Sequence, residues 1–127
     1  MFFIPLISLS IGSIGLEVEA QQKKAPTNEQ VNLYMSLNTI VLCRALEQKI
    51  PFKQALSVAV SSAVTAVMAF HDGQVPGGGK VSPEKIANSA ALAIVLQGAQ
   101  NCPDLIPAEE KKKAEEFVKR IKAASKR

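Results

Sequence analysis

The 127-residue sequence predicts an all-α protein, a four-helix bundle-like domain with one disulfide that follows an N-terminal signal peptide. Two observations predict this fold class. Apolar residues recur at helical spacing in four segments, and no segment alternates apolar and polar residues as a half-buried strand does. The chain has only five Phe, one Tyr and no Trp, so its core must be built from Ala, Val, Leu and Ile, which suit closely packed helices.

The first twenty residues predict the signal peptide. An apolar stretch covers residues 2 to 16, and Val-Glu-Ala at residues 18 to 20 has the small-residue pattern of a cleavage site. The stretch is shorter than the roughly 20 residues that span a bilayer. No Lys or Arg precedes it, so a short anchor or a buried N-terminal helix stays open. We expect cleavage after Ala20 and export to the periplasm, the thylakoid lumen or the extracellular space.

Residues 21 to 127 are expected to form a single α-helical domain. Loss of Glu17 and Glu19 from the 11 acidic residues would raise the net charge from +4 to +6. Basic surfaces attract nucleic acid or anionic lipid, but most of the excess here lies in one C-terminal segment. So few aromatic residues poorly suit nucleic-acid recognition, and we expect no specific nucleic-acid partner. A merely solubilising role for the basic segment is therefore favoured over nucleic-acid or lipid binding.

The first two helices are predicted over residues 28–49 and 52–71. Thr27 and Gln30 have the spacing of a capping box at the start of the first helix. The buried face of this helix is predicted to comprise Val31, Tyr34, Leu37, Val41 and Leu46, widened by Leu33, Ile40 and Cys43. The second helix has no charge between residues 54 and 70, so we expect it to be the central helix of the bundle. A membrane span is its alternative, and we expect none in the mature chain.

The third and fourth helices are predicted over residues 83–101 and 107–125. The third begins with the cap residue Ser82 and then Pro83, and it stops before Pro103. The fourth has one apolar stripe on an otherwise charged helix, formed by Ala114, Phe117, Val118, Ile121 and Ala124.

Cys43 and Cys102 are the only cysteines, and in an exported protein such a pair most simply forms one disulfide. It would join the first helix to the end of the third. Two buried thiols are the alternative in a reducing compartment. Two Cys and one His are too few for tetrahedral zinc, so we expect no metal site.

The segment "HDGQVPGGGK" at residues 71 to 80 resembles a phosphate-binding loop only superficially. Gln74 stands where a Walker loop needs its first glycine, and Val81 stands where it needs a hydroxyl. We interpret the segment as a turn, with weak anion binding by backbone N–H groups and Lys80 as the alternative. His71 is the only histidine, so no Ser-His-Asp relay can be built without it. We therefore expect no catalytic residue and no cofactor.

The stretches "TNEQVNLYMSLNTIVLCRA", "HDG" and "LQGAQNCPDLIP" resemble small exported helical proteins of marine cyanobacteria that have no established activity. The resemblance covers roughly residues 27 to 118. Some look-alikes carry the label of class-II cAMP phosphodiesterase, which His71 alone cannot support because that enzyme needs a histidine-rich two-metal site. The layout is also similar to HdeA-type periplasmic chaperones, which implies acid-driven exposure of apolar faces.

The sequence favours a non-enzymatic exported binding protein, with a chaperone-like mode as one form, that contacts a protein or anionic partner. The residues expected to make this contact are Lys80, Lys111, Lys112, Lys113, Lys119, Arg120 and Lys122. One alternative is a carrier with a small apolar ligand in the helical core. Another is a hydrolase that uses His71. The oligomeric state stays open.

Overall fold

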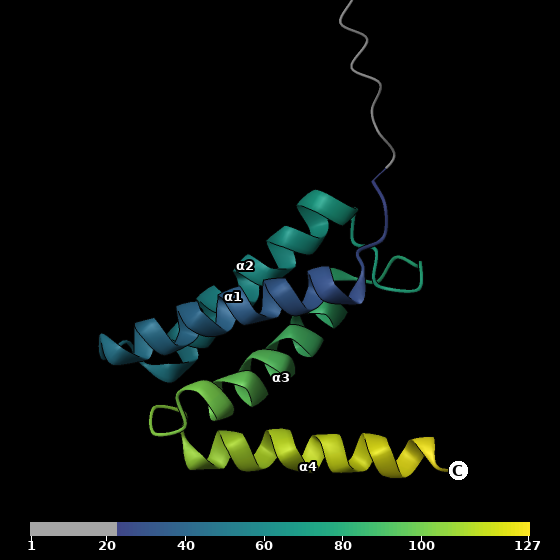
Figure 1. Ribbon diagram of the computed structural model, residues 1–127. Helices are drawn as coiled ribbons and strands as arrows, with labels where there is room; N and C mark the ends of the chain where they lie inside the picture. The colour runs from purple at the N-terminus through teal and green to yellow at the C-terminus, as the bar shows by residue number, and fades with distance from the viewer. Residues whose placement is uncertain (1–22) are drawn as a thin grey trace, which may run out of the picture.

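The computed structural model describes residues 23–127, so the predicted signal peptide lies outside the described residues. The prediction of four helices is confirmed. They are α1 (Asn28–Glu47), α2 (Phe52–His71), α3 (Pro83–Asn101) and α4 (Ala108–Ser125), and no strand is present in residues 23–127 (Figure 1).

The arrangement consists of three mutually packed helices and a fourth that lies outside them. Helices α1, α2 and α3 each contact the other two, whereas α4 contacts only α3 (Figure 1). The prediction that the second helix is central was therefore wrong, because α3 is the helix that touches all the others. Uncharged small residues around α2 suggested burial on all sides, yet its Ser and Thr side chains face solvent.

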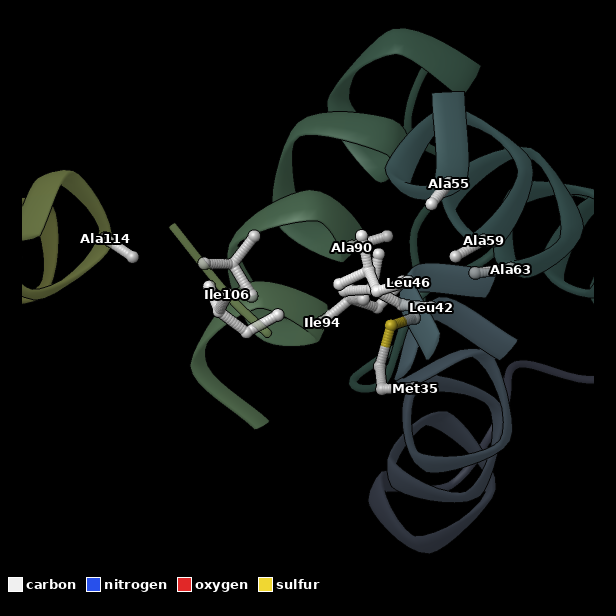
Figure 2. Close-up of a cluster of buried hydrophobic side chains, with 11 residues drawn as sticks. Met35, Leu42, Leu46, Ala55, Ala59, Ala63, Ala90, Ile94, Ile106 and Ala114 are labelled. Atoms are coloured by element: carbon white, nitrogen blue, oxygen red, sulfur yellow. The ribbon is translucent and has the colours of Figure 1, made fainter. Parts of the chain in front are cut away.

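Small residues spaced four apart form the α2 side of the core. On α2 the buried positions Ala55, Ala59 and Ala63 are at most 1% exposed. On α3 the equivalent row is Ile86, Ala90, Ile94 and Gly98. Rows of residues at i and i+4 are the ridges that most often interdigitate between packed helices. Small side chains on these ridges bring the helices close together, and the core side chains gather between them (Figure 2).

The buried face of α1 differs from the predicted one. Met35, Leu42 and Leu46 point inward with the polar Asn38 and Thr39, whereas four of the eight residues of the predicted face are exposed to solvent. The exposed residues are Leu33, Leu37, Ile40 and Val41, at 41–55% exposure. Because α1 carries aliphatic residues all round, periodicity alone could not choose between its two faces. Of the predicted face only Leu46 is fully buried.

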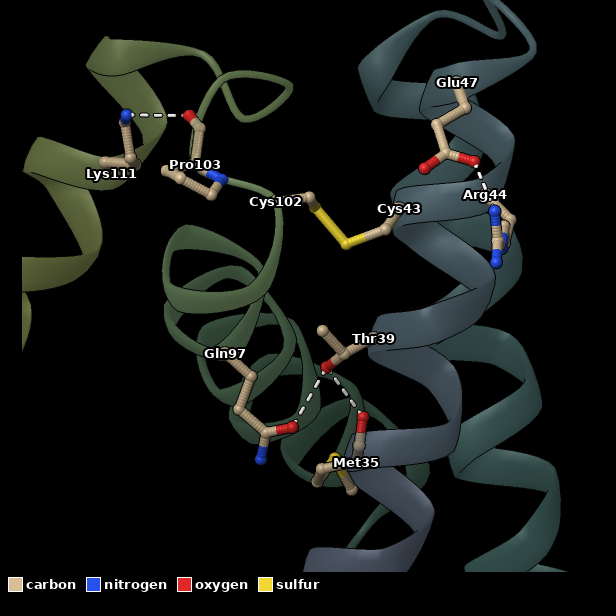
Figure 3. Close-up of a disulfide and its surroundings, with 9 residues drawn as sticks. All are labelled: Met35, Thr39, Cys43, Arg44, Glu47, Gln97, Cys102, Pro103 and Lys111. Carbon is tan, nitrogen blue, oxygen red and sulfur yellow. Dashed lines mark hydrogen bonds and ion pairs between the residues drawn. A yellow bond between two sulfur atoms is a disulfide. The ribbon is translucent and has the colours of Figure 1, made fainter.

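The polar residues inside this face satisfy their hydrogen bonds locally. The Thr39 hydroxyl lies 2.8 Å from the Met35 carbonyl oxygen and 3.1 Å from Oε1 of Gln97 on α3 (Figure 3). Asn38 Nδ2 donates to the Tyr34 carbonyl at 2.8 Å. Such pairing removes most of the free-energy cost of burying a polar group, so Asn38 and Thr39 can lie on the buried face.

The helix ends follow the sequence signals closely. The capping box of Thr27 and Gln30 is present, and Ser82 caps α3. Helix α1 ends two residues before its predicted boundary, because Lys49 has a φ of 64°, a left-handed conformation that stops the helix ahead of Pro51.

The predicted disulfide is confirmed. Cys43 on α1 joins Cys102 at the end of α3, with their Cα atoms 6.1 Å apart (Figure 3). Such a disulfide is consistent with a non-reducing compartment. Arg44 and Glu47 form an exposed ion pair beside it, with 2.9 Å between Nη1 and Oε2.

Replacing both cysteines with Ala should lower the free energy of unfolding by about 4 kcal/mol, because the bond closes a loop across 59 positions of sequence. Urea unfolding at one protein concentration measures this. Reduction of the unmodified protein should give a similar loss, which separates the cross-link from the effect of the new side chains. A loss below about 1 kcal/mol in both experiments would show that the bond is not a major source of stability.

Candidate functional site

A pocket lies between α1, α3 and the loop that joins α2 to α3. Its volume is about 520 Å³, which falls in the range of small-molecule sites. Most of its lining is apolar. The apolar residues are Val31, Met35, Val67, Val75, Pro76, Val81, Ile86, Ala90 and Ala93.

Small residues on α3 and the folded-back loop between α2 and α3 together form this pocket. Ala90 and Ala93 leave space that larger side chains would fill. The loop folds back on itself, since Val75 N–H donates to the Gly79 carbonyl at 3.1 Å and Val81 N–H to the Gly73 carbonyl at 3.1 Å.

A glycine is required where the loop begins. Gly73 has a φ of 73°, and a Cβ there would lie 3.1 Å from the Met68 sulfur. The sequence predicted only a turn for this segment. The structure adds that the turn places Val75, Pro76 and Val81 as one wall of the pocket. No motif in the sequence signals this role, because it depends on how the loop packs.

Polar side chains are confined to a few places in the pocket. Asn32, Gln74, Ser89, Lys85 and Gln97 contribute the polar part of the lining. Lys85 is exposed, and it forms no ion pair within residues 23–127. An apolar body with a polar or anionic head is the ligand chemistry that this arrangement fits.

His71 is not placed on the pocket. It is 7% exposed, and its Nδ1 lies 2.8 Å from the Lys24 carbonyl oxygen. A carbonyl oxygen only accepts, so Nδ1 carries the proton and Nε2 accepts a hydrogen bond from the Tyr34 hydroxyl at 2.8 Å. Gln74 Nε2 likewise donates to the Lys23 carbonyl at 2.7 Å. These bonds hold the segment before α1 against the end of α2.

Lys80 lies in the loop and is paired with Asp72. The lysine donates to the Asp72 carboxylate, and this hydrogen bond is the main reason that the pKa of Asp72 lies below its usual value. Asp72 itself has a φ of 53° just after α2. The pair therefore links the two ends of the loop, and any anion bound at Lys80 would compete with the Asp72 carboxylate.

The predicted cations of α4 divide into two groups. Toward the N-terminus, Lys113 Nζ lies 2.8 Å from Glu109 Oε1, and the hydrogen bonds that Lys113 donates to Glu109 and then to Glu110 raise the pKa of Lys113. Lys112 pairs with Glu116 at 4.0 Å, and Lys111 donates to the Pro103 carbonyl at 3.0 Å (Figure 3).

The cations toward the C-terminus of α4 have no acidic partner among the described residues. Lys119, Arg120 and Lys122 form no ion pair with any described residue. The Arg120 guanidinium instead lies 5.7 Å from the centre of the Phe117 ring. Phe117 and Ile121 are 45% and 51% exposed, whereas Ala114 in the first half of α4 is buried, and α4 diverges from α3 toward the C-terminus (Figure 1).

Two further properties bear on the kind of site present. Within residues 23–127 no three His, Cys, Asp or Glu side chains are grouped as metal ligands. In the same part of the chain, α2 alone is long and apolar enough to cross a membrane, with a mean hydropathy of 1.4, a property that core helices of soluble proteins share.

Comparison with known proteins gives a family and nothing more specific. No curated protein and no solved structure matches the chain. Residues 29–126 match a single family, so the match covers all four helices and both cysteines. The chain belongs to the family described as a domain of unknown function, DUF8650.

Proposed function

We propose that the protein binds and carries a small, mainly apolar ligand with a polar or anionic head. The observation that supports this most directly is the 520 Å³ pocket, whose apolar wall is interrupted only by a few polar side chains. A cavity of this size accepts a fatty acid or a molecule of similar bulk. Lys85 would contact the head group, and Ala93 would contact the apolar body.

The disulfide supports a non-reducing compartment as the place where this carrier would work. Because such a bond persists only outside reducing compartments, we infer an exported carrier in the periplasm or an equivalent space. A carrier there would move or store a poorly soluble molecule across an aqueous gap. This role needs no catalytic group, which agrees with a histidine whose two nitrogens are both engaged in structural hydrogen bonds.

A second candidate function is the binding of an acidic protein by the C-terminal half of α4. From Phe117 to Arg127 the chain has five cations and no acid. Because α4 contacts only α3, this half projects away from the other helices. Cations without local partners attract an acidic surface more strongly than cations already paired with glutamates.

The chaperone-like mode receives no such support. Acid-driven opening needs carboxyl groups that titrate inside a closed core. In residues 23–127 every Asp and Glu is exposed, apart from the half-exposed Glu110. Their protonation would therefore do little to open the packed helices.

Filling the pocket should abolish ligand binding. Ala93→Phe places a ring in the pocket, so the affinity for anilinonaphthalene sulfonate, an apolar anion that fluoresces when bound, should fall at least about tenfold. Ala124→Phe, the same change on the exposed end of α4, is the control and should bind normally. Ser89→Phe, at an exposed lining position, repeats the test if Ala93→Phe folds poorly. Equal binding by all variants would contradict the pocket as the site.

The role of Lys85 is tested with a matched pair of ligands. Lys85→Gln should weaken displacement of the probe by a medium-chain fatty acid about fivefold. It should leave displacement by the corresponding uncharged alcohol unchanged. Equal effects on both ligands would show that Lys85 does not contact the head group.

Removing the unpaired cations of α4 should weaken binding to an acidic partner more than removing the paired ones. With polyglutamate as the probe at low salt, a triple Gln variant at Lys119, Arg120 and Lys122 should lose about tenfold in affinity. The matched triple Gln variant at residues 111 to 113 removes the same charge and should lose less than about threefold. Equal losses would mean that only net charge matters.

A further inference from the structure

The side of α1 that faces away from the other helices is aliphatic. This outer face consists of Leu33, Leu37, Ile40 and Val41, which are 55%, 52%, 54% and 41% exposed. They recur at three- and four-residue steps, so they form one stripe along the helix. Contiguous apolar surface of this kind on a soluble protein marks an interaction site.

Charge is placed only at the two ends of this stripe. No charged residue occurs between Glu29 and Arg44, which begin and end it, about 22 Å apart at the helical rise. Both ends are exposed, and the side chain of Arg44 retains 76% of its accessibility despite its ion pair with Glu47. The stripe is therefore an uncharged centre with an acid at one end and a base at the other.

This pattern is complementary to a second copy of the same helix that runs in the opposite direction. The midpoint between Glu29 and Arg44 falls between Ser36 and Leu37, and so does the midpoint between Leu33 and Ile40. We propose that the outer face of α1 pairs with the same face of a second copy of this chain, with the two helices antiparallel. A two-fold axis at that midpoint places each glutamate against the other copy's arginine and each Leu33 against Ile40.

The neighbouring helix extends the contact. Phe70, 64% exposed near the end of α2, stacks on Tyr34 with the ring centres 6.5 Å apart. Tyr34 lies one turn from Leu37 on α1, so the aromatic pair continues the aliphatic surface. An acidic protein or an anionic bilayer would need cations along the centre of the stripe, and that centre has none. The second copy satisfies both the apolar centre and the charged ends.

The first test is the mass of the protein in solution. In sedimentation equilibrium, the mass of the protein should approach twice the monomer mass as its concentration is raised to about 200 µM. Leu37→Glu should give the monomer, with unchanged helical circular dichroism. Ile121→Glu introduces the same charge at an equally exposed aliphatic position, 51% against 52%, on a helix that does not touch α1, and it should remain dimeric. A monomeric wild type, a dimeric Leu37→Glu variant, or binding of the wild type to vesicles as a monomer would overturn the proposal.

The second test concerns the antiparallel pairing. Glu29→Arg alone or Arg44→Glu alone places like charges opposite each other at both symmetry-related contacts of the dimer. Each single variant should therefore raise the dimer dissociation constant about tenfold. The double variant restores opposite charges and should return to within about threefold of wild type. A double variant as weak as the poorer single variant would overturn the proposed pairing.

Discussion

The packing of α2 against α1 and α3 through a row of small residues is the constraint on which the rest of this structure depends. Ala55, Ala59 and Ala63 present no side chain larger than a methyl group. Helices packed this way enclose little volume, so few large side chains fit between them. Leu42 and Ile94 occupy the centre, and they are among the largest side chains that are fully buried.

Two features follow from this limited interior. Aliphatic residues of α1 that the core cannot accept are placed on its outer face, where they remain exposed in a single chain. In the middle of α3, Ala90 and Ala93 line the pocket together with α1 and the glycine-rich loop. Small residues thus allow tight packing on α2 and leave a cavity beside α3. The disulfide then fixes α1 to the end of α3.

The sequence predicted what depends on local signals. The caps at Thr27 and Ser82 predicted where helices begin, and the single pair of cysteines predicted the disulfide. It did not predict which face of α1 is buried, because that helix is aliphatic all round and one hydrogen-bond partner of the buried Thr39, Gln97, lies on another helix. The central position of α3 and the pocket wall at Val75 could not be predicted either. Both depend on how separate elements pack.

The most direct test of this account compares two alanines of α2. Ala59 is fully buried on the small-residue row, and Ala69 is exposed ten positions later on the same helix. Ala59→Leu should lower the free energy of unfolding by about 2 kcal/mol, because the larger side chain forces the helices apart. Ala69→Leu should change it by less than about 0.5 kcal/mol. Equal effects in denaturant unfolding would contradict the claim that close packing through this row determines the fold.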